Sequence, residues 1–266
     1  AEHGRIRLAA AADRELAELA APALLVEDDE VRWADGAVVA RRVRRLGAIV
    51  LSEVRLDAPD PDALTAAVRQ GLRSEGLGLL RWSEHARRLR DRLATLHRVF
   101  GGSGDDGWPD VSDAALLADP DRWWIAPLAR ARSRADLSRV DAAAVLRTLL
   151  DHRQAARLDE LAPERIPVPS GSRIAVDYSA DQPVLAVKVQ EVFGWTGTPT
   201  VADGRLPVVL HLLSPAGRPA AVTADLTSFW ATGYPQVRAE LRGRYPKHAW
   251  PEDPLTAPTR PPRAHR

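Results

Sequence analysis

Residues 30–57 read EVRWADGAVVARRVRRLGAIVLSEVRLD, and this stretch decides the fold of the first part of the chain. The dipeptide Asp35-Gly36 is a strong signal for a two-residue β-hairpin turn. Apolar residues such as Trp33 and Val38 alternate with polar ones on both sides of that turn, which indicates half-buried strands. The stretch therefore predicts a β-meander, and residues 1–58 are expected to form part of a small β-barrel or sheet.

The hydrophobic period then changes from two residues to between three and four, which is typical of helices. Asp60 is placed to cap a helix with Pro61 in its first turn. A second helix is expected up to Phe100, and shorter ones begin at Ser112 and within 138–150. Residues 59–162 therefore predict a helical domain.

Strands are expected again after the Pro- and Ser-rich boundary at 163–172. Alternating apolar residues predict strands near 174–178, 185–189 and 206–212, followed by helices beginning at Thr223 and near Pro235. The fold class is thus α+β, with a partial β-barrel, a helical middle segment and a second small β/α domain with C-terminal helices. That last domain covers residues 163–250, and 251–266 are expected to be a disordered, flexible tail rich in Pro and Arg.

Composition and motifs argue against catalysis within this chain. It has 266 residues, a net charge of +1 and no cysteine, which excludes a disulfide framework, a Cys-type zinc site and a thiol nucleophile. Neither lysine, Lys188 or Lys247, follows a glycine as a P-loop requires, and the serine-hydrolase and H-E-x-x-H motifs are missing. We therefore expect no catalytic residue, no metal site and no cofactor in this chain.

Location follows from similar arguments. No apolar run approaches the roughly 18 residues that span a bilayer, and the first residues do not read as a secretory signal. We expect no membrane partner and a cytoplasmic, reducing environment. The sequence contains no methionine, so we expect it to be a processed product or a piece of something longer.

The first basic cluster is ARRVRRL at 40–46. Strand alternation places Arg42 and Arg44 on one face of the sheet, and Arg41 and Arg45 with Val43 on the other. One interpretation is a solvated edge strand that charge protects from aggregation. The other is a sheet face that binds a phosphate backbone. A second arginine-rich stretch, at 81–98, favours an ordinary salt-bridged helix surface.

The last basic cluster, LRGRYPKHAW at 241–250, mixes cations with rings. Cations can follow phosphates while aromatic faces stack on unpaired bases. The alternative is that Tyr245 and Trp250 hold the end of a helix against the barrel while the cations remain solvated. The two interpretations do not exclude one another.

Several blocks of the sequence resemble the C-terminal region of HrpB-type DEAH-box ATP-dependent RNA helicases of bacteria. They include EGLGLLRWSEHARRLRDRL, GRLPVVLHLLSPAGRPAAVTADLTSFW and YPQVRAELRGRYPKHAWPEDP, in the expected order. The resemblance covers essentially residues 4–255, and RGRYPKHAWPEDP is its most specific block. The stretch 101–160 matches less well.

The resemblance implies the later part of an OB-like barrel plus a family-specific C-terminal region. The ATPase motifs of such helicases, with their ATP and Mg²⁺, belong to two RecA-like lobes that have no counterpart here. In related helicases the OB-like domain contacts RNA and regulators, which would place ARRVRRL on that surface.

We therefore expect a noncatalytic accessory region that binds single-stranded RNA or DNA and positions it for the lobes. The alternative is an interaction or autoregulatory module that docks the helicase lobes or other proteins. The expected nucleic-acid-binding residues are Arg41, Arg42, Arg44, Arg45, Arg242, Arg244, Tyr245, Lys247, His248 and Trp250.

Overall fold

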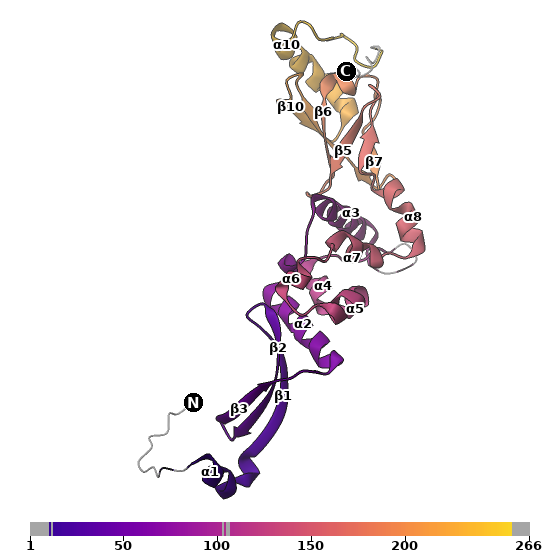
Figure 1. Cartoon of the computed structure of the whole chain (residues 1–266). Coiled ribbons are helices and arrows are strands. Elements are labelled where there is room, and N and C mark those ends of the chain that lie inside the picture. The colour runs from indigo at the N-terminus through magenta and orange to yellow at the C-terminus, as the bar shows by residue number, and fades with distance from the viewer. Residues whose placement is uncertain (1–10, 12, 103, 105–106, 257–266) are drawn as a thin grey trace, which may run out of the picture. The chain divides into compact units, whose positions relative to one another are not determined.

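A computed structural model describes residues 11, 13–102, 104 and 107–256 (Figure 1). The chain divides into two compact units that interleave in the sequence. Unit 1 consists of the described residues up to Arg81 together with Leu117–Val140, and unit 2 of Trp82–Leu116 together with the residues from Asp141 onward. The helical segment expected at 59–162 thus contributes to both units. No helix among the described residues combines the length and apolar character needed to cross a membrane.

Unit 1 is built on the meander that the sequence predicts. Strands β1 (Leu25–Ala34), β2 (Ala37–Leu46) and β3 (Ile49–Arg55) form an antiparallel sheet with β2 in the centre. The turn residues Asp35 and Gly36 both have positive φ, as a type I′ hairpin requires. The described residues of this unit form an open three-stranded sheet, which is one of the two forms expected from the sequence, and no closed barrel is observed among them.

Helices pack against the first part of this meander. Unit 1 contains α1 (Arg14–Ala20), α2 (Pro61–Glu75), α5 (Asp121–Arg130), α6 (Arg134–Leu137) and the 3-10 turns Pro22–Leu24 and Leu77–Leu79. Asp60 caps α2 by accepting the Ala63 N–H, as its sequence predicts. The Trp33 ring lies so close to Gly71 that a Cβ there would come within 2.4 Å of it, so only glycine fits this crossing of β1 and α2.

The helices of unit 2 are α3 (Glu84–Phe100), α7 (Ala142–Thr148) and α8 (His152–Leu161), and α4 (Asp113–Ala118) contains the position where the sequence passes to unit 1. Ser83 caps α3, and its buried stripe includes Leu89 and Leu96, as the spacing predicts. Ser138 follows the last residue of α6, and Asp141 caps α7 by accepting the Ala143 N–H.

The larger sheet of unit 2 has the order β10-β9-β6-β5-β4, and β6 and β9 pair in parallel. Its strands are β4 (Arg165–Pro167), β5 (Arg173–Asp177), β6 (Val184–Lys188), β9 (Val209–Leu213) and β10 (Pro219–Thr223). A small hairpin of β7 (Thr200–Val201) and β8 (Leu206–Pro207) accompanies it, and a 3-10 turn covers Val189–Glu191. Two expectations were wrong in detail: the run 206–212 is divided between β8 and β9, and Thr223 ends a strand.

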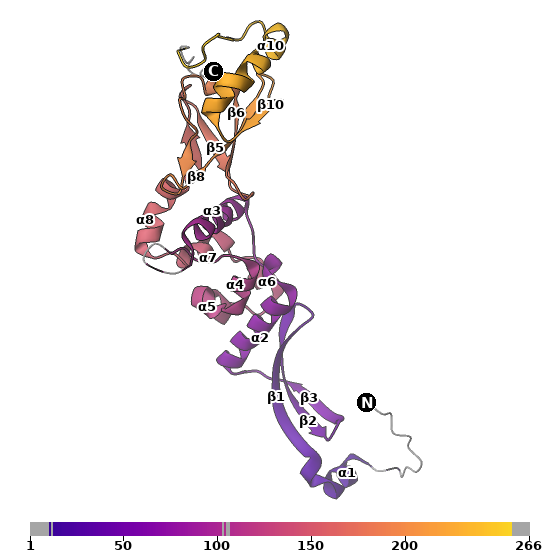
Figure 2. The same ribbon diagram turned by 180° about the vertical axis from the view of Figure 1, so that it is seen from behind.

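The C-terminal helices follow this sheet (Figure 2). A short α9 (Leu226–Ser228), capped by Asp225, continues through a π-helical turn (Phe229–Gly233) into α10 (Tyr234–Arg244). The π turn brings Trp230 and Tyr234 into edge-on contact, with ring centroids 5.4 Å apart. This buried aromatic cluster anchors the helix that carries the last basic block.

Candidate functional site

The basic cluster on β2 meets an acidic strand. The sequence EDDE at 27–30 lies on β1, and the strand register places Asp29 opposite Arg42 and Glu30 opposite Arg41. Strand alternation separates the arginines as expected: Arg41 and Arg45 both bind Glu30 on the face where Val43 is buried. Each face of this sheet therefore carries both signs of charge.

Every arginine of this cluster forms an ion pair. Arg42 binds Asp29 through two nitrogens, at 2.7 and 3.1 Å. Arg44 donates to Glu18 of α1 at 2.7 Å, and Arg41 also reaches Glu53 of β3 at 2.5 Å. In these contacts carboxylate oxygens accept the guanidinium N–H groups that a phosphate would otherwise bind.

The pairing also sets the acidity of the carboxylates. The hydrogen bond from Arg45, followed by that from Arg41, lowers the pKa of Glu30 below its ordinary value. The hydrogen bond from Arg42 lowers the pKa of Asp29 in the same way. Both groups are therefore more firmly ionised near neutral pH than free carboxyls, and they retain their guanidinium partners.

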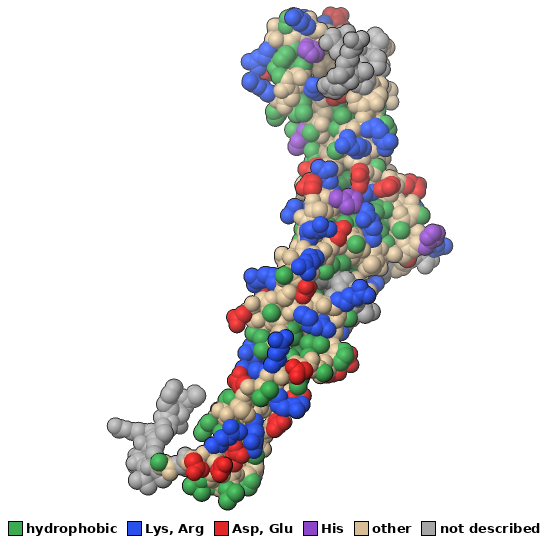
Figure 3. Space-filling model, in the orientation of Figure 1, with side chains coloured by type: hydrophobic (Ala, Val, Ile, Leu, Met, Phe, Trp, Pro, Cys, Tyr) green, Lys and Arg blue, Asp and Glu red, His purple; other side chains and the backbone are tan. Residues whose placement is uncertain are grey.

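The basic block at the end of α10 has a different environment. Arg242 and Arg244 lie in the last turn of the helix, and Lys247 follows it. All three are exposed, and no ion pair joins any of them to another described residue. Glu240 lies one helical turn before Arg244, yet it forms no ion pair with it. Figure 3 shows Lys and Arg side chains gathered over α10.

The residues after α10 are fixed by hydrogen bonds to the body of unit 2. Trp250 donates its indole N–H to the Tyr245 carbonyl at 3.1 Å, and Arg238 donates to the Trp250 carbonyl at 2.9 Å. The buried Tyr234 hydroxyl donates to the Pro251 carbonyl at 2.9 Å. The Gly194 N–H donates to the Pro254 carbonyl. The segment 251–254, expected to belong to a flexible tail, is thus held in place, while 257–266 lie outside the described residues.

The rings of this block have unequal roles. Tyr245 and His248 stand edge to face, with centroids 6.1 Å apart. His248 is exposed, whereas Tyr245 and Trp250 are half-buried. The hydrogen bond of Trp250 supports the interpretation that it holds the helix end, and the solvated cations beside it remain available to a ligand. The structure thus brings the last six expected site residues together in unit 2, and the four arginines of β2 lie in unit 1.

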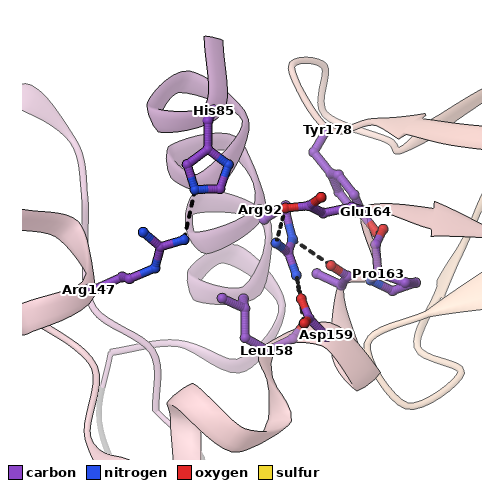
Figure 4. Close-up of polar contacts among 9 residues, drawn as sticks. His85, Arg92, Arg147, Leu158, Asp159, Pro163, Glu164 and Tyr178 are labelled. Atoms are coloured by element: carbon purple, nitrogen blue, oxygen red, sulfur yellow. Dashed lines mark hydrogen bonds and ion pairs between the residues drawn. The ribbon is translucent and has the colours of Figure 1, made fainter. Parts of the chain in front are cut away.

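One buried arginine escaped the sequence-based interpretation. Arg92, in the stretch expected to be salt-bridged surface, is only 3% exposed. It donates to the Ala162 carbonyl at 2.6 Å and the Leu158 carbonyl at 3.3 Å, and it pairs with Asp159 and Glu164 (Figure 4). It therefore satisfies the carbonyl groups at the end of α8. Its spacing with the apolar residues Leu89 and Leu96 was the available signal.

No group of three or more His, Cys, Asp or Glu residues suited to a metal ion is found within the described part of the chain. His85 instead accepts a hydrogen bond from Arg147 at 2.7 Å (Figure 4), and His97 contacts the Trp108 carbonyl at 2.7 Å.

Comparison with known proteins identifies the region. Residues 123–254, which include all of the α10 block, match the family model described as ATP-dependent helicase C-terminal, HrpB_C. Over 260 residues the chain is 41% identical to the ATP-dependent RNA helicase HrpB of Escherichia coli strain K12. The chain carries the C-terminal region of the HrpB family.

The solved structures agree. The HrpB-type region matches a crystal structure titled as the E. coli DExH-box NTPase HrpB with a TM-score of 0.72 at 39% identity, covering 94% of this chain. A second structure, titled as the E. coli DEAH/RHA helicase HrpB, matches with a TM-score of 0.63 at 39% identity over 85% of this chain. The HrpB-type region spans 32% of the curated relative and 31% and 29% of the crystallised chains.

Proposed function

We propose that this chain is a noncatalytic accessory region of a bacterial ATP-dependent RNA helicase, and that it holds the backbone of a single strand at the end of α10. The observation that carries the proposal is the set of exposed cations Arg242, Arg244 and Lys247, which form no ion pair with any described residue. Unpaired cations attract polyanions through counterion release. ATP hydrolysis and strand movement, with the ATP and Mg²⁺ that they need, would belong to RecA-like lobes elsewhere in the parent protein.

The local backbone supports this role. Hydrogen bonds to the Trp250 and Pro251 carbonyls fix the path of the chain beyond α10, so the cations project from an ordered segment. An ordered site loses less conformational entropy when it binds a ligand. Tyr245 and His248 add ring faces beside the cations, on which unpaired bases can stack at about 1–3 kcal/mol per base.

The experiment is fluorescence anisotropy with a labelled single-stranded RNA at several salt concentrations. Replacing Arg242, Arg244 and Lys247 together by Ala removes three cations, and each contributes about 0.7 to the salt slope for a single strand. We expect the slope to fall by about 2. The matched control replaces Arg87, Arg173 and Arg218 by Ala, since these are also exposed residues of unit 2. Equal losses in the two triple variants contradict the proposed site.

A second candidate function is the docking of protein. The edge strand β3 exposes Ile49 to 64% and Val54 to 63%, and exposed apolar groups are typical of surfaces that contact other segments. On this view the chain docks the helicase lobes or other proteins and regulates them. Pull-down with isolated lobes, with and without RNA, separates the two: RNA-independent capture that Ile49→Ser abolishes supports docking.

A further inference from the structure

A second site lies in unit 2, apart from the block after α10. A cavity of about 500 Å³ is present between the end of α3 and the start of α8. Its apolar lining is provided by Phe100, Trp108, Ala156 and Leu161. A cavity of this size and character is suited to a small organic molecule with an apolar body.

The polar residues around this cavity are mainly cationic. His152, Arg153 and Arg157 line it from α8. Arg157 donates to Asp203 at 2.7 Å, so one of its nitrogens is occupied. Arg153 is exposed and forms no ion pair with any described residue. The Asp151 carboxylate, which also lines the cavity, accepts the Gln154 N–H in the cap of α8. The Asp151 carboxylate keeps its negative charge, so Arg153 is the residue of this lining that is suited to an anion.

The aromatic residues define the rest of the ligand. Arg205 already lies over the Phe100 ring, with its guanidinium carbon 4.6 Å from the ring centroid. Arg205 thus covers one side of the ring, and Phe100 also lines the cavity, where a flat group can lie against it. Gln154 donates to the Gly107 carbonyl at 2.7 Å, and His97 contacts the Trp108 carbonyl. These two contacts hold in place the segment that forms the cavity wall opposite α8.

We propose that this cavity binds a nucleoside monophosphate unit, with the base against Phe100, beside the buried Trp108, and the phosphate at Arg153. A flat ring system matches the aromatic lining, and an anionic group matches the unpaired guanidinium. The unit could be supplied either by a free nucleotide or by the phosphorylated end of a strand. The site does not depend on the α10 block, because it uses none of its residues.

The test is isothermal titration of the whole chain with adenosine 5′-monophosphate, adenosine and inorganic phosphate. We expect saturable binding of the monophosphate, and weaker binding of either half alone. Arg153→Ala should weaken monophosphate binding about tenfold, the effect of one charge-assisted hydrogen bond. Phe100→Leu should weaken it by a similar factor through lost stacking. Arg218→Ala, which removes an exposed arginine away from the cavity, should leave it unchanged.

The controls separate this proposal from the strand-binding one. The variant lacking Arg242, Arg244 and Lys247 should bind the monophosphate with unchanged affinity, even though its affinity for RNA is reduced. In that variant, displacement of the monophosphate by a short RNA with a 5′-phosphate, but not by the same RNA without it, identifies a strand end as the source. A lack of displacement by both identifies a free nucleotide.

Three results overturn the proposal. The first is an absence of saturable monophosphate binding. The second is binding of adenosine or of inorganic phosphate as tight as that of the monophosphate. The third is unchanged monophosphate binding in a folded Arg153→Ala protein. Thermal unfolding of each variant establishes that it is folded.

Discussion

The basic stretch on β2 and the basic stretch after α10 differ in what lies opposite them. In unit 1, Arg41 and Arg42 face the carboxylates of Glu30 and Asp29 across a strand register. In unit 2, Arg244 and Lys247 extend from a helix end with no carboxylate bound to them among the described residues. Two stretches of similar charge in the sequence thus differ in whether their cations are free to bind a ligand. What decides whether a cation can bind phosphate is its partner in the fold.

The exposed ion pairs of unit 1 are not strong stabilising elements. Pairs of this kind contribute little because water screens them and ordering the side chains costs entropy. A phosphate would have to displace a carboxylate before it could reach these arginines. We therefore expect the β2 cluster to contribute less to the proposed strand binding than the α10 block.

The largest effect is expected from removing the carboxylates that pair with the β2 arginines. In the double variant Asp29→Asn with Glu30→Gln, the guanidinium groups of Arg41, Arg42 and Arg45 lose their main partners. We expect RNA affinity to rise about tenfold and the salt slope to become steeper by about 2. Anisotropy titrations measure both. Unchanged binding in the folded variant would show that this sheet cannot accept a strand.

The second prediction concerns the anchoring of the α10 block. Tyr234→Phe removes the hydroxyl that donates to the Pro251 carbonyl and leaves that acceptor without its partner. Burial raises the pKa of Tyr234 to about 12, so the hydroxyl is protonated and donates throughout the neutral range. We expect a loss of about 1 kcal/mol in the free energy of unfolding. Denaturant unfolding measures it, and Tyr245→Phe, whose hydroxyl has no partner among the described residues, is the matched control.

A smaller effect is expected from the β2 arginines themselves. Replacing Arg42 and Arg44 by Ala in the otherwise unchanged chain should alter RNA affinity less than about threefold, because both are already paired. A loss as large as that of the α10 triple variant would assign both clusters to the interface and show that the paired arginines are as available to RNA as the unpaired ones.

The smallest effect is a dependence of stability on pH. Glu18, Asp29 and Glu30 have pKa values lowered in the folded state, from ordinary values of 4.5, 3.8 and 4.5. Their contribution is fully present above those values and is lost as the pH falls through the lower folded values. Melting temperatures measured from pH 6 to pH 3 should therefore fall less steeply for Asp29→Asn with Glu30→Gln than for the unchanged chain. Parallel curves would contradict this.

Local signals in the sequence accounted for much of the fold. Asp35-Gly36 predicted the hairpin because a type I′ turn needs positive φ, and Asp60-Pro61 predicted the start of α2 because caps act over a few residues. The failures were non-local. The sequence pattern predicts a helix start at Thr223, but pairing with β9 makes Thr223 the last residue of β10. For residues 1–58 the pattern leaves a partial barrel and a sheet open, and strand pairing gives an open three-stranded sheet among the described residues.

The candidate site was predictable only in part. The sequence by itself determined which residues are cationic, how they alternate on a strand and which family the chain resembles. All three properties depend only on residue type and order. The tertiary structure alone decided that Glu30 neutralises Arg41 and Arg45 while Lys247 stays free of described partners, and that Arg92 is buried. The physical reason is that electrostatic availability depends on distances in space, and strand register and helix packing set those distances.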